Sequence, residues 1–351
     1  MDLDAERLND LMGRAVADMG AAASGVLVII GDRLGLFTAL AQHAPLLPGK
    51  LAELTGTQER MVREWLAAMA ASGYILYEPA DGTFRMTPEQ IALLADPDSP
   101  FFLASAYPCI AALYKDEPIV TAAFRHGLGV GWDEHHADLF HGTERFFSRV
   151  YENFLIPVWL PSLGNVVEKL AMGAVVADIG CGHGATTLLM ARSFPKSLFL
   201  GFDAHEPSIQ TAAQRLEETD LVNVIFRTCP AETVPPENYD LVVFCDSFHE
   251  MGNPAGIAGH MRNVLSPDGT LMLIEQKAED RIEENFHPAG RMGYSFSTMI
   301  CVPGAIRQGA EEALGNQAGL YRLETVLRAG GFSRIRKTVE TPLHMVIEAK
   351  K

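Results

Sequence analysis

A glycine-rich turn between an apolar run and a helix-forming run constrains this chain more than any other feature. The turn reads Asp-Ile-Gly-Cys-Gly-His-Gly over residues 178–184. It follows a buried strand expected at 174–179 and precedes a helix expected at 185–193. Glycines allow a tight turn and the close approach of a ligand to the backbone, and amides at a helix N-terminus favour a negatively charged group. The segment therefore predicts a ligand site at the carboxyl end of a strand.

An acidic residue follows at the spacing expected of a ribose-binding side chain. Asp203 ends the next apolar run, residues 200–203, and a carboxylate about 20 residues beyond a glycine turn holds ribose hydroxyls in nucleotide sites. The glycine spacing is G-x-G-x-G rather than G-x-G-x-x-G, and Asp178 lies two residues before the first glycine. Both details disfavour a dinucleotide site. The alternative is a purely structural strand-to-helix turn.

Strand-like and helix-like runs alternate from residue 173 onwards. This order is typical of a doubly wound α/β domain with a mainly parallel sheet. The runs that follow the first strand predict six more strands, at 198–202, 224–227, 239–245, 270–275, 334–340 and 344–349. The helices expected between or beside them lie at 185–193, 208–218, 257–265 and 320–329.

The first 95 residues have a different pattern. Two helices are expected at 49–56 and 57–72, the second capped by Thr57, and two short β runs at 74–77 and 83–86. Helix, turn, helix and hairpin form a winged-helix arrangement. The expected division is a helical winged-helix domain, a helical linker region and an α/β ligand-binding domain, at 1–95, 96–172 and 173–351.

The charge balance of the chain disfavours nucleic acid as a partner. The chain has 28 Lys and Arg against 44 Asp and Glu, a net charge of −16. Residues 1–95 carry seven basic and twelve acidic residues, and the second helix of the winged part balances Arg60 and Arg63 with Glu59 and Glu64. Because DNA binding needs a basic face around such a helix, the apolar N-terminal helices predict a homodimer interface. A DNA-binding regulator that senses a small molecule is the weaker alternative.

Cysteine usage and the N-terminus indicate the compartment. The five cysteines are scattered, with no C-x-x-C pair that would indicate a zinc ribbon or a disulfide framework. The first residues are acidic, whereas a signal peptide begins with basic residues. The apolar run at 26–30 is far shorter than the roughly 20 residues that span a bilayer. We expect a cytoplasmic protein with reduced thiols and no membrane partner.

Residues 173–350 resemble the class I S-adenosylmethionine-dependent methyltransferases. The segment 178–184 is similar to the first motif of that family, 239–243 to its fourth strand, and 265–271 to the lead into its fifth. The resemblance implies a seven-stranded Rossmann-like sheet and S-adenosylmethionine as the cofactor. The residues that it implies for cofactor binding are Asp178, Gly180, Cys181, Gly182 and Gly184 near the methionine part, Asp203 at the ribose, Ala231 and Glu232 at the adenine, and Asp246 near the methionine end.

A second resemblance concerns the reaction. The segment Asp-Ser-Phe-His-Glu-Met-Gly-Asn-Pro at 246–254 is similar to the catalytic stretch of small-molecule O-methyltransferases with an N-terminal winged-helix dimerisation domain. In that family a histidine followed by an acid removes the proton of the acceptor, and His249 is the matching residue. An imidazole with a pKa of about 6.5 can serve as a base at neutral pH. A structural histidine in a loop is the alternative.

The residues expected to line the acceptor pocket come from two segments. The linker region contributes Trp132, His135, His136, Phe147 and Tyr151, and the stretch between the fifth strand and the last helix contributes Tyr294, Phe296 and Met299. Packing is the alternative role for the aromatic residues. His135, His136 and His141 also suggest a metal site, but their spacing is loose, and we expect no metal.

These observations together predict methyl transfer from S-adenosylmethionine to a small-molecule hydroxyl or thiol, with His249 as the general base. A thiol needs less help from a base because its pKa is about 8.5, so an S-methyltransferase of a small thiol or sulfide is the first alternative. A protein that binds the cofactor without transferring methyl is the second.

Overall fold

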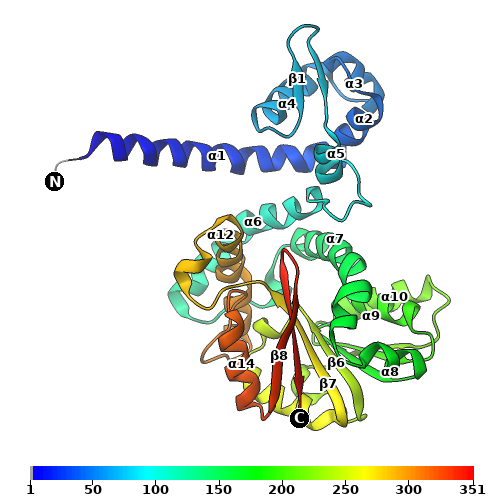
Figure 1. Cartoon of the computed structure of the whole chain (residues 1–351). Coiled ribbons are helices and arrows are strands. Elements are labelled where there is room, and N and C mark those ends of the chain that lie inside the picture. The colour runs from blue at the N-terminus through cyan, green and yellow to red at the C-terminus, as the bar shows by residue number, and fades with distance from the viewer. Residues whose placement is uncertain (1–2) are drawn as a thin grey trace. The chain divides into compact units, whose positions relative to one another are not determined.

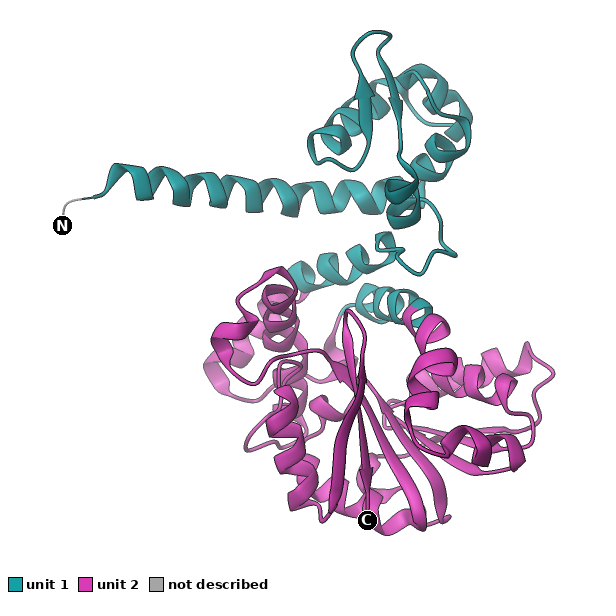
Figure 2. Cartoon of the chain, in the orientation of Figure 1, with its two compact units in different colours: residues 1–115, 136–149 teal, residues 116–135, 150–351 magenta. Residues whose placement is uncertain are grey.

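A computed structural model describes residues 3–351 of the chain, which divides into two compact units (Figures 1 and 2). Unit 1 comprises the chain up to residue 115 together with residues 136–149, and unit 2 comprises residues 116–135 and 150–351. The region expected to link the domains, 96–172, thus contributes to both units. The division into 1–95, 96–172 and 173–351 stays a prediction.

Unit 1 contains the winged-helix arrangement. Its elements are α1 (Ala5–Arg33), α2 (Leu36–His43), α3 (Pro48–Thr55), α4 (Glu59–Ala71), β1 (Leu76–Glu78), β2 (Thr83–Arg85), α5 (Pro88–Leu94), the 3-10 turn η1 (Ala104–Ala106) and the parts within unit 1 of α6 (Tyr107–His126) and α7 (Ala137–Phe154). Strands β1 and β2 pair antiparallel. Phe37, Leu66 and Met69 are among the apolar side chains that these elements bury in one core. The expectation that Thr57 caps α4 is wrong: Gln58 is the N-cap residue, and the Thr57 hydroxyl lies 2.8 Å from that of Thr55.

Helix α1 is longer than the winged part needs. It runs for 29 residues, begins where the Asp4 carboxylate accepts hydrogen bonds from the amides of Glu6 and Arg7, and extends away from the rest of the winged part (Figure 1). Its only buried residues in the described chain are Val28, Ile29 and Gly31. By length and composition it is also apolar enough to cross a bilayer. The apolar run at 26–30 is only one part of this helix, so the expectation of no membrane partner stays a prediction.

Unit 2 is built on a seven-stranded sheet, as the sequence predicts. The strands are β3 (Val175–Ile179), β4 (Leu198–Asp203), β5 (Val224–Thr228), β6 (Tyr239–Cys245), β7 (Leu265–Gln276), β8 (Arg334–Glu340) and β9 (His344–Lys350). Their order is β5-β4-β3-β6-β7-β9-β8, with β9 antiparallel to both of its neighbours and the first five strands parallel. The carboxyl ends of β3, β4, β6 and β7 therefore meet at one edge.

Both faces of this sheet are covered, because successive side chains of a strand point to opposite sides. In β6, Val242 and Phe244 pack with the helices on one face, and Leu241 and Val243 pack on the other. The first face is covered by α11 (Pro254–Val264) and α14 (Gly319–Ala329). The second is covered by α8 (Val166–Met172), α9 (Ala185–Ser193) and the turns η3 (Leu155–Trp159) and η4 (Leu160–Ser162). Strands buried on both faces explain the nearly continuous apolar runs of the sequence.

The remaining elements of unit 2 connect the strands or follow β7. They are the short turns η2 (Trp132–Glu134), η5 (Ala231–Thr233), η6 (Phe248–Glu250) and η7 (Ile282–Asn285), the helices α10 (Glu206–Glu217), α12 (Pro288–Phe296) and α13 (Val302–Arg307), and the π-helical turn η8 (Ser297–Cys301). Of these, η2, η6 and η8 contribute side chains to the site described next.

Candidate active site

The glycine turn follows β3 and has the backbone that its sequence predicts. Gly180, Gly182 and Gly184 have φ values of 70°, 52° and 81°, a region that side chains with a Cβ rarely adopt. A Cβ on Gly184 would lie 2.6 Å from the ring of Phe226, whereas a Cβ on Gly182 would meet no described atom within 4 Å. The turn is therefore packed at Gly184 and open at Gly182, as a cradle for a ligand must be.

Asp178 ties the turn to the helix that follows. Its Oδ2 accepts hydrogen bonds from the hydroxyls of Thr186 and Thr187, each at 2.6 Å, in the first turn of α9. The side chain is buried, and burial raises the pKa of this carboxyl. Its Oδ1 is buried with no hydrogen-bond partner among residues 3–351. A buried carboxylate oxygen without a donor is costly, so a donor from a ligand would be favoured there.

Asp203 closes β4 beside the same turn. Its Oδ2 accepts from the amide of Gly182 at 2.9 Å, and its Oδ1 accepts from the amide of His205 at 2.8 Å. Burial raises the pKa of Asp203. The carboxylate is thus fixed by two backbone donors next to the open glycine. Cys181 is buried, Ala231 is buried in η5, and Glu232 is exposed beside it.

Asp246 lies immediately after β6 and has an unusual backbone, with φ at 52°. Its carboxylate is hydrogen-bonded to three side chains from separate elements. The partner atoms are Tyr151 Oη at 3.0 Å, His344 Nε2 at 2.9 Å and Gln276 Nε2 at 2.7 Å. Burial would raise the pKa of Asp246, but His344 and these hydrogen bonds outweigh it, and the pKa is lowered. A charged carboxylate is therefore held at the edge of the sheet.

His249 lies one turn further along, in η6. Its Nδ1 is 2.5 Å from Oε2 of Glu275, and both side chains are buried. Burial alone would lower the pKa of His249, but Glu275 and Cys301 together outweigh burial and raise that pKa well above its usual range. Glu275 is the next-to-last residue of β7, so adjacent parallel strands bring the pair together. The contact fixes the orientation of the ring through Nδ1 and leaves Nε2 as the ring nitrogen that can interact with other groups.

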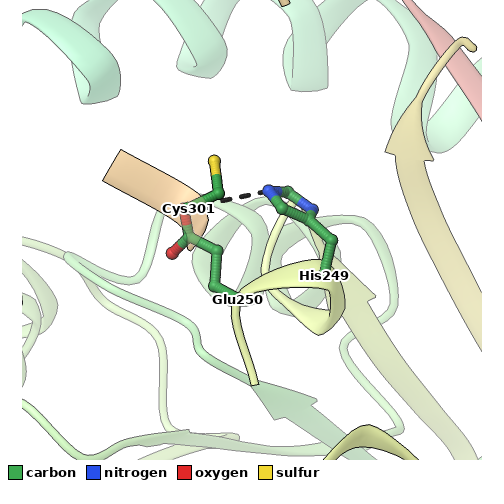
Figure 3. A group of neighbouring side chains, drawn as sticks. All are labelled: His249, Glu250 and Cys301. Carbon is green, nitrogen blue, oxygen red and sulfur yellow. Dashed lines mark ion pairs between the residues drawn. The ribbon is translucent and has the colours of Figure 1, made fainter. Parts of the chain in front are cut away.

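Nε2 of His249 faces Glu250 and Cys301 (Figure 3). Oε1 of Glu250 is 3.8 Å from Nε2, and Oε2 of Glu250 accepts from Nε1 of Trp132 at 2.7 Å. Burial raises the pKa of Glu250, and it raises the pKa of the Cys301 thiol to about 12. The imidazole nitrogen thus faces two further polar groups within a buried space.

The structure brings together some of the residues expected at the acceptor. Trp132 and Tyr151 contact Glu250 and Asp246, as given above. His135 is buried, and its Nδ1 is 2.9 Å from Oδ2 of Asp116, which is a structural pairing. His136 and Phe147 belong to unit 1, where His136 lies 3.4 Å from Nζ of Lys115 and Phe147 packs against Phe146.

The expected second wall is only partly assembled. Tyr294 lines a surface cavity of about 630 Å³ with residues of α14, such as Tyr321 and Arg322, rather than with His249. Phe296 precedes η8 and its carbonyl oxygen lies 4.0 Å from Sγ of Cys301. Met299 is half-buried within η8. The roles of these residues at the acceptor stay predictions.

Four residues that contact the predicted His249 and Asp246 were not expected from the sequence: Glu275, Gln276, His344 and Cys301. Glu275 carries a usable signal, since an acid near the carboxyl end of the strand beside a catalytic loop points to the same edge. Gln276 has the same signal. His344 and Cys301 have none, because only the folded chain brings β9 and η8 to this edge.

Two family models match the chain. Residues 170–321 match the model described as a methyltransferase domain, and residues 22–96 match an Rv2258c-like winged HTH domain. A highly reducing polyketide synthase of Emericella nidulans is 30% identical over 185 residues, which are 50% of this chain and 6% of that protein. The chain thus spans a small part of that relative.

Solved structures match over the whole chain. Human N-acetylserotonin methyltransferase, in complex with S-adenosylmethionine, has a TM-score of 0.71 at 16% identity and covers 100% of this chain and 99% of its own. An O-methyltransferase family protein from Burkholderia thailandensis has a TM-score of 0.70 at 16% identity, with the same coverage. These likenesses confirm the predicted fold. The chain therefore combines a methyltransferase domain with an N-terminal winged helix-turn-helix domain.

Proposed function

We propose that this protein transfers the methyl group of S-adenosylmethionine to a hydroxyl or thiol of a small molecule. The observation that carries the proposal is the His249–Glu275 pair at the sheet edge that also holds the glycine turn and Asp203. A cofactor cradle and an oriented base at one edge suit the transfer of a group to an acceptor that must lose a proton.

The residues of the edge fit the proposed cofactor. The turn formed by Gly180, Cys181, Gly182 and Gly184 is open at Gly182, and Asp178 adds a buried oxygen that lacks a donor. Asp203 would hold the ribose, Ala231 and Glu232 would contact the adenine, and Asp246 would lie near the methionine end. The bound cofactor supplies a methyl group activated by its sulfonium.

His249 is the proposed base. Because the pKa of His249 is raised, the neutral imidazole that can act as a base is populated as pH rises through that pKa, and turnover should rise with pH accordingly. A neutral hydroxyl or thiol becomes a good nucleophile when its proton passes to Nε2 of the neutral ring as the methyl group is transferred. Glu275 holds Nδ1, so the ring keeps one orientation, and its charge favours the imidazolium that forms. A thiol acceptor requires less of this base, and transfer to sulfur is therefore the second candidate.

Unit 1 supports a homodimer as the working form. The exposed apolar side chains Leu8, Met12, Met19 and Val26 recur along α1 at spacings of four and seven residues, which places them on one face. A second copy of α1 is the occupant that we propose for this face. Arg60 and Arg63 pair with Glu64 and Glu59 on α4 at 2.5 and 2.6 Å, which supports a role other than DNA binding.

The five cysteines are free thiols, which supports the proposal of a cytoplasmic protein, because thiols stay reduced in that compartment.

The test is product formation. Purified protein is incubated with S-adenosylmethionine and panels of phenols, thiols and carboxylates, and S-adenosylhomocysteine is measured. We expect release with a phenol or thiol, and a fall of about 10²–10⁴-fold in turnover for His249→Ala, the range that general base catalysis supplies. Binding of S-adenosylmethionine, measured by calorimetry, should stay within about twofold of the wild type if His249 acts in the chemical step.

The exposed His126 on α6 provides the control, since His126→Ala removes an imidazole without touching the site. Undiminished turnover in His249→Ala would refute the base. Release of no product with any panel, together with normal cofactor binding, would favour a cofactor-binding protein that transfers no methyl group.

A further inference from the structure

We propose that His249, Glu250 and Cys301 form a binding site for a divalent transition metal ion, with zinc as the ion that suits it best. The three residues each present one ligand atom, and these atoms all lie within 4.8 Å of one another (Figure 3). All three side chains are buried, including the carboxylate and the thiol. The inference goes beyond methyl transfer, and metal binding is measurable whether or not the protein is active.

The donor set has the chemistry of a zinc site. An imidazole nitrogen, a thiolate sulfur and a carboxylate oxygen are all established zinc ligands, and three protein ligands leave a tetrahedral ion one open position. A soft sulfur ligand and an imidazole nitrogen in the same site also disfavour calcium and magnesium, because these ions bind oxygen ligands. Cys301 would release its thiol proton to solvent as the metal–sulfur bond forms, because a coordinating thiol is deprotonated.

Residues next to the proposed ligands hold them by hydrogen bonds, as residues around metal sites commonly do. A metal-bound histidine donates its other ring nitrogen to a carboxylate in such sites, and Nδ1 of His249 lies 2.5 Å from Oε2 of Glu275. Trp132 orients the Glu250 carboxylate through a 2.7 Å hydrogen bond to Oε2, which leaves Oε1 as the atom toward Nε2. Two of the three ligands are therefore already held in one orientation.

The third ligand comes from a different segment. His249 and Glu250 lie in η6, whereas Cys301 ends the π-helical turn η8. Turns of this kind are frequent at functional sites. A bound ion would join the two segments and would occupy Nε2, the atom assigned above to proton transfer. Metal and acceptor should therefore exclude one another.

The first experiment measures metal binding to the full chain after removal of metals with a chelator. Zinc is added in competition with a chromogenic chelator, and cobalt(II) is added separately to record its absorption spectrum. We expect one ion per chain and a sulfur-to-cobalt charge-transfer band in the near ultraviolet, which reports a thiolate ligand. Cys301→Ser should abolish that band, and it should weaken zinc binding by at least about tenfold.

Three variants separate the site from general effects. Glu250→Gln should weaken zinc binding but keep the sulfur band. Cys229→Ser removes a half-buried thiol outside the cluster and should change neither. Circular dichroism and thermal unfolding show that each variant is folded. Zinc binding of Cys301→Ser equal to that of the wild type, or a cobalt spectrum without the sulfur band, would overturn the proposal.

The result is distinguishable from failure of methyl transfer. If the metal-free protein releases S-adenosylhomocysteine and binds no zinc, the metal site is wrong and the proposed function stands. If zinc binds through Cys301 but no panel yields product, the metal site stands and the proposed function fails. If both hold, added zinc should inhibit the metal-free enzyme, and Cys301→Ser should show weaker inhibition.

Discussion

Nδ1 of His249 lies 2.5 Å from Oε2 of Glu275, although 26 residues separate them in the chain. The parallel register of β6 and β7 explains the contact, since Cys245 pairs with Ile274 and the next residue of β7 is Glu275. The turn after β6 then returns His249 to the end of the neighbouring strand. A carboxylate at the end of one strand thus orients an imidazole on the loop that follows the neighbouring strand.

Glu275→Gln tests this relationship. The variant keeps the size of the side chain but removes the charge that favours the imidazolium and the preference for a proton on Nδ1. We expect turnover to fall by about 10²-fold or more, as when the orienting carboxylate of a catalytic triad is neutralised. Cofactor affinity should change little. Steady-state assays and calorimetry on the same preparation measure both quantities.

Glu283→Gln, at an exposed acid of η7, is the matched control and should leave turnover unchanged. Wild-type turnover in Glu275→Gln would show that the His249–Glu275 contact has a structural role and does not support catalysis. A fall in thermal stability large enough to explain the lost activity would lead to the same conclusion.

The sheet was predictable because its physical causes are local. Apolar runs of strand length, glycines at turns and helical spacing between them are all visible in the sequence, and β6, α9 and β8 have the predicted bounds. The ends of the other elements moved by a few residues, since capping depends on the folded neighbours: Gln58, rather than Thr57, is the N-cap of α4.

The site was predictable only where its residues follow one another in the chain. The glycine turn, Asp203 and the segment 246–250 are contiguous signals at strand ends. Cys301 and His344 reach the same edge through η8 and β9, and Tyr151 reaches Asp246 from the last turn of α7. Tertiary contacts of this kind follow no fixed spacing in the sequence, and the expectation that Tyr294, Phe296 and Met299 form a wall of the acceptor pocket stays a prediction.

A comparison of two glycines tests the cradle. Gly184→Ala places a Cβ 2.6 Å from the Phe226 ring in addition to the strain of its positive φ, whereas Gly182→Ala introduces only the strain of its φ. We expect Gly184→Ala to destabilise the protein by about 2–4 kcal/mol, from strain and overpacking together, and Gly182→Ala by about 1 kcal/mol. Chemical unfolding measures the difference.

The two variants should differ in cofactor binding as well. Gly182 borders open space, so Gly182→Ala should weaken S-adenosylmethionine binding more than its small effect on stability suggests. Phe226→Leu combined with Gly184→Ala should recover part of the lost stability, because the smaller side chain can move. Equal destabilisation by the two alanines would contradict the packed and open ends assigned to the turn.

Asp178 gives a pH dependence whose sign is fixed by burial. Because burial raises its pKa in the folded chain, the folded protein favours the neutral carboxyl. Its contribution to stability is then fully present below the unfolded pKa of about 3.9 and is lost as pH rises through the folded value. Asp178→Asn removes this loss, so its stability relative to the wild type should rise between pH 4 and pH 8.

Thermal unfolding of the ligand-free protein across that range measures the effect. Asp81→Asn is the control of opposite sign, since hydrogen bonds from Thr83 lower the pKa of Asp81 at the surface of unit 1. Asp178→Asn should also weaken cofactor binding if the unpartnered Oδ1 of Asp178 receives a donor from the ligand. A stability difference that does not depend on pH would show that Asp178 is not titrating in the folded chain.

Met19→Glu on α1 tests the proposed dimer. Met12 and Met19 are seven residues apart and 57% and 63% exposed, so a charge at Met19 should leave the fold of one chain unchanged. If a second α1 covers this face, burying the carboxylate costs several kcal/mol and should shift the protein from dimer to monomer. Light scattering after size exclusion measures the mass, and Ala17→Glu places the same charge on the opposite face of the helix as a control. If Met19→Glu leaves the mass unchanged, the α1 interface is contradicted. If the wild type sediments with lipid vesicles and Met19→Glu does not, the exposed face of α1 binds a membrane instead of a second copy.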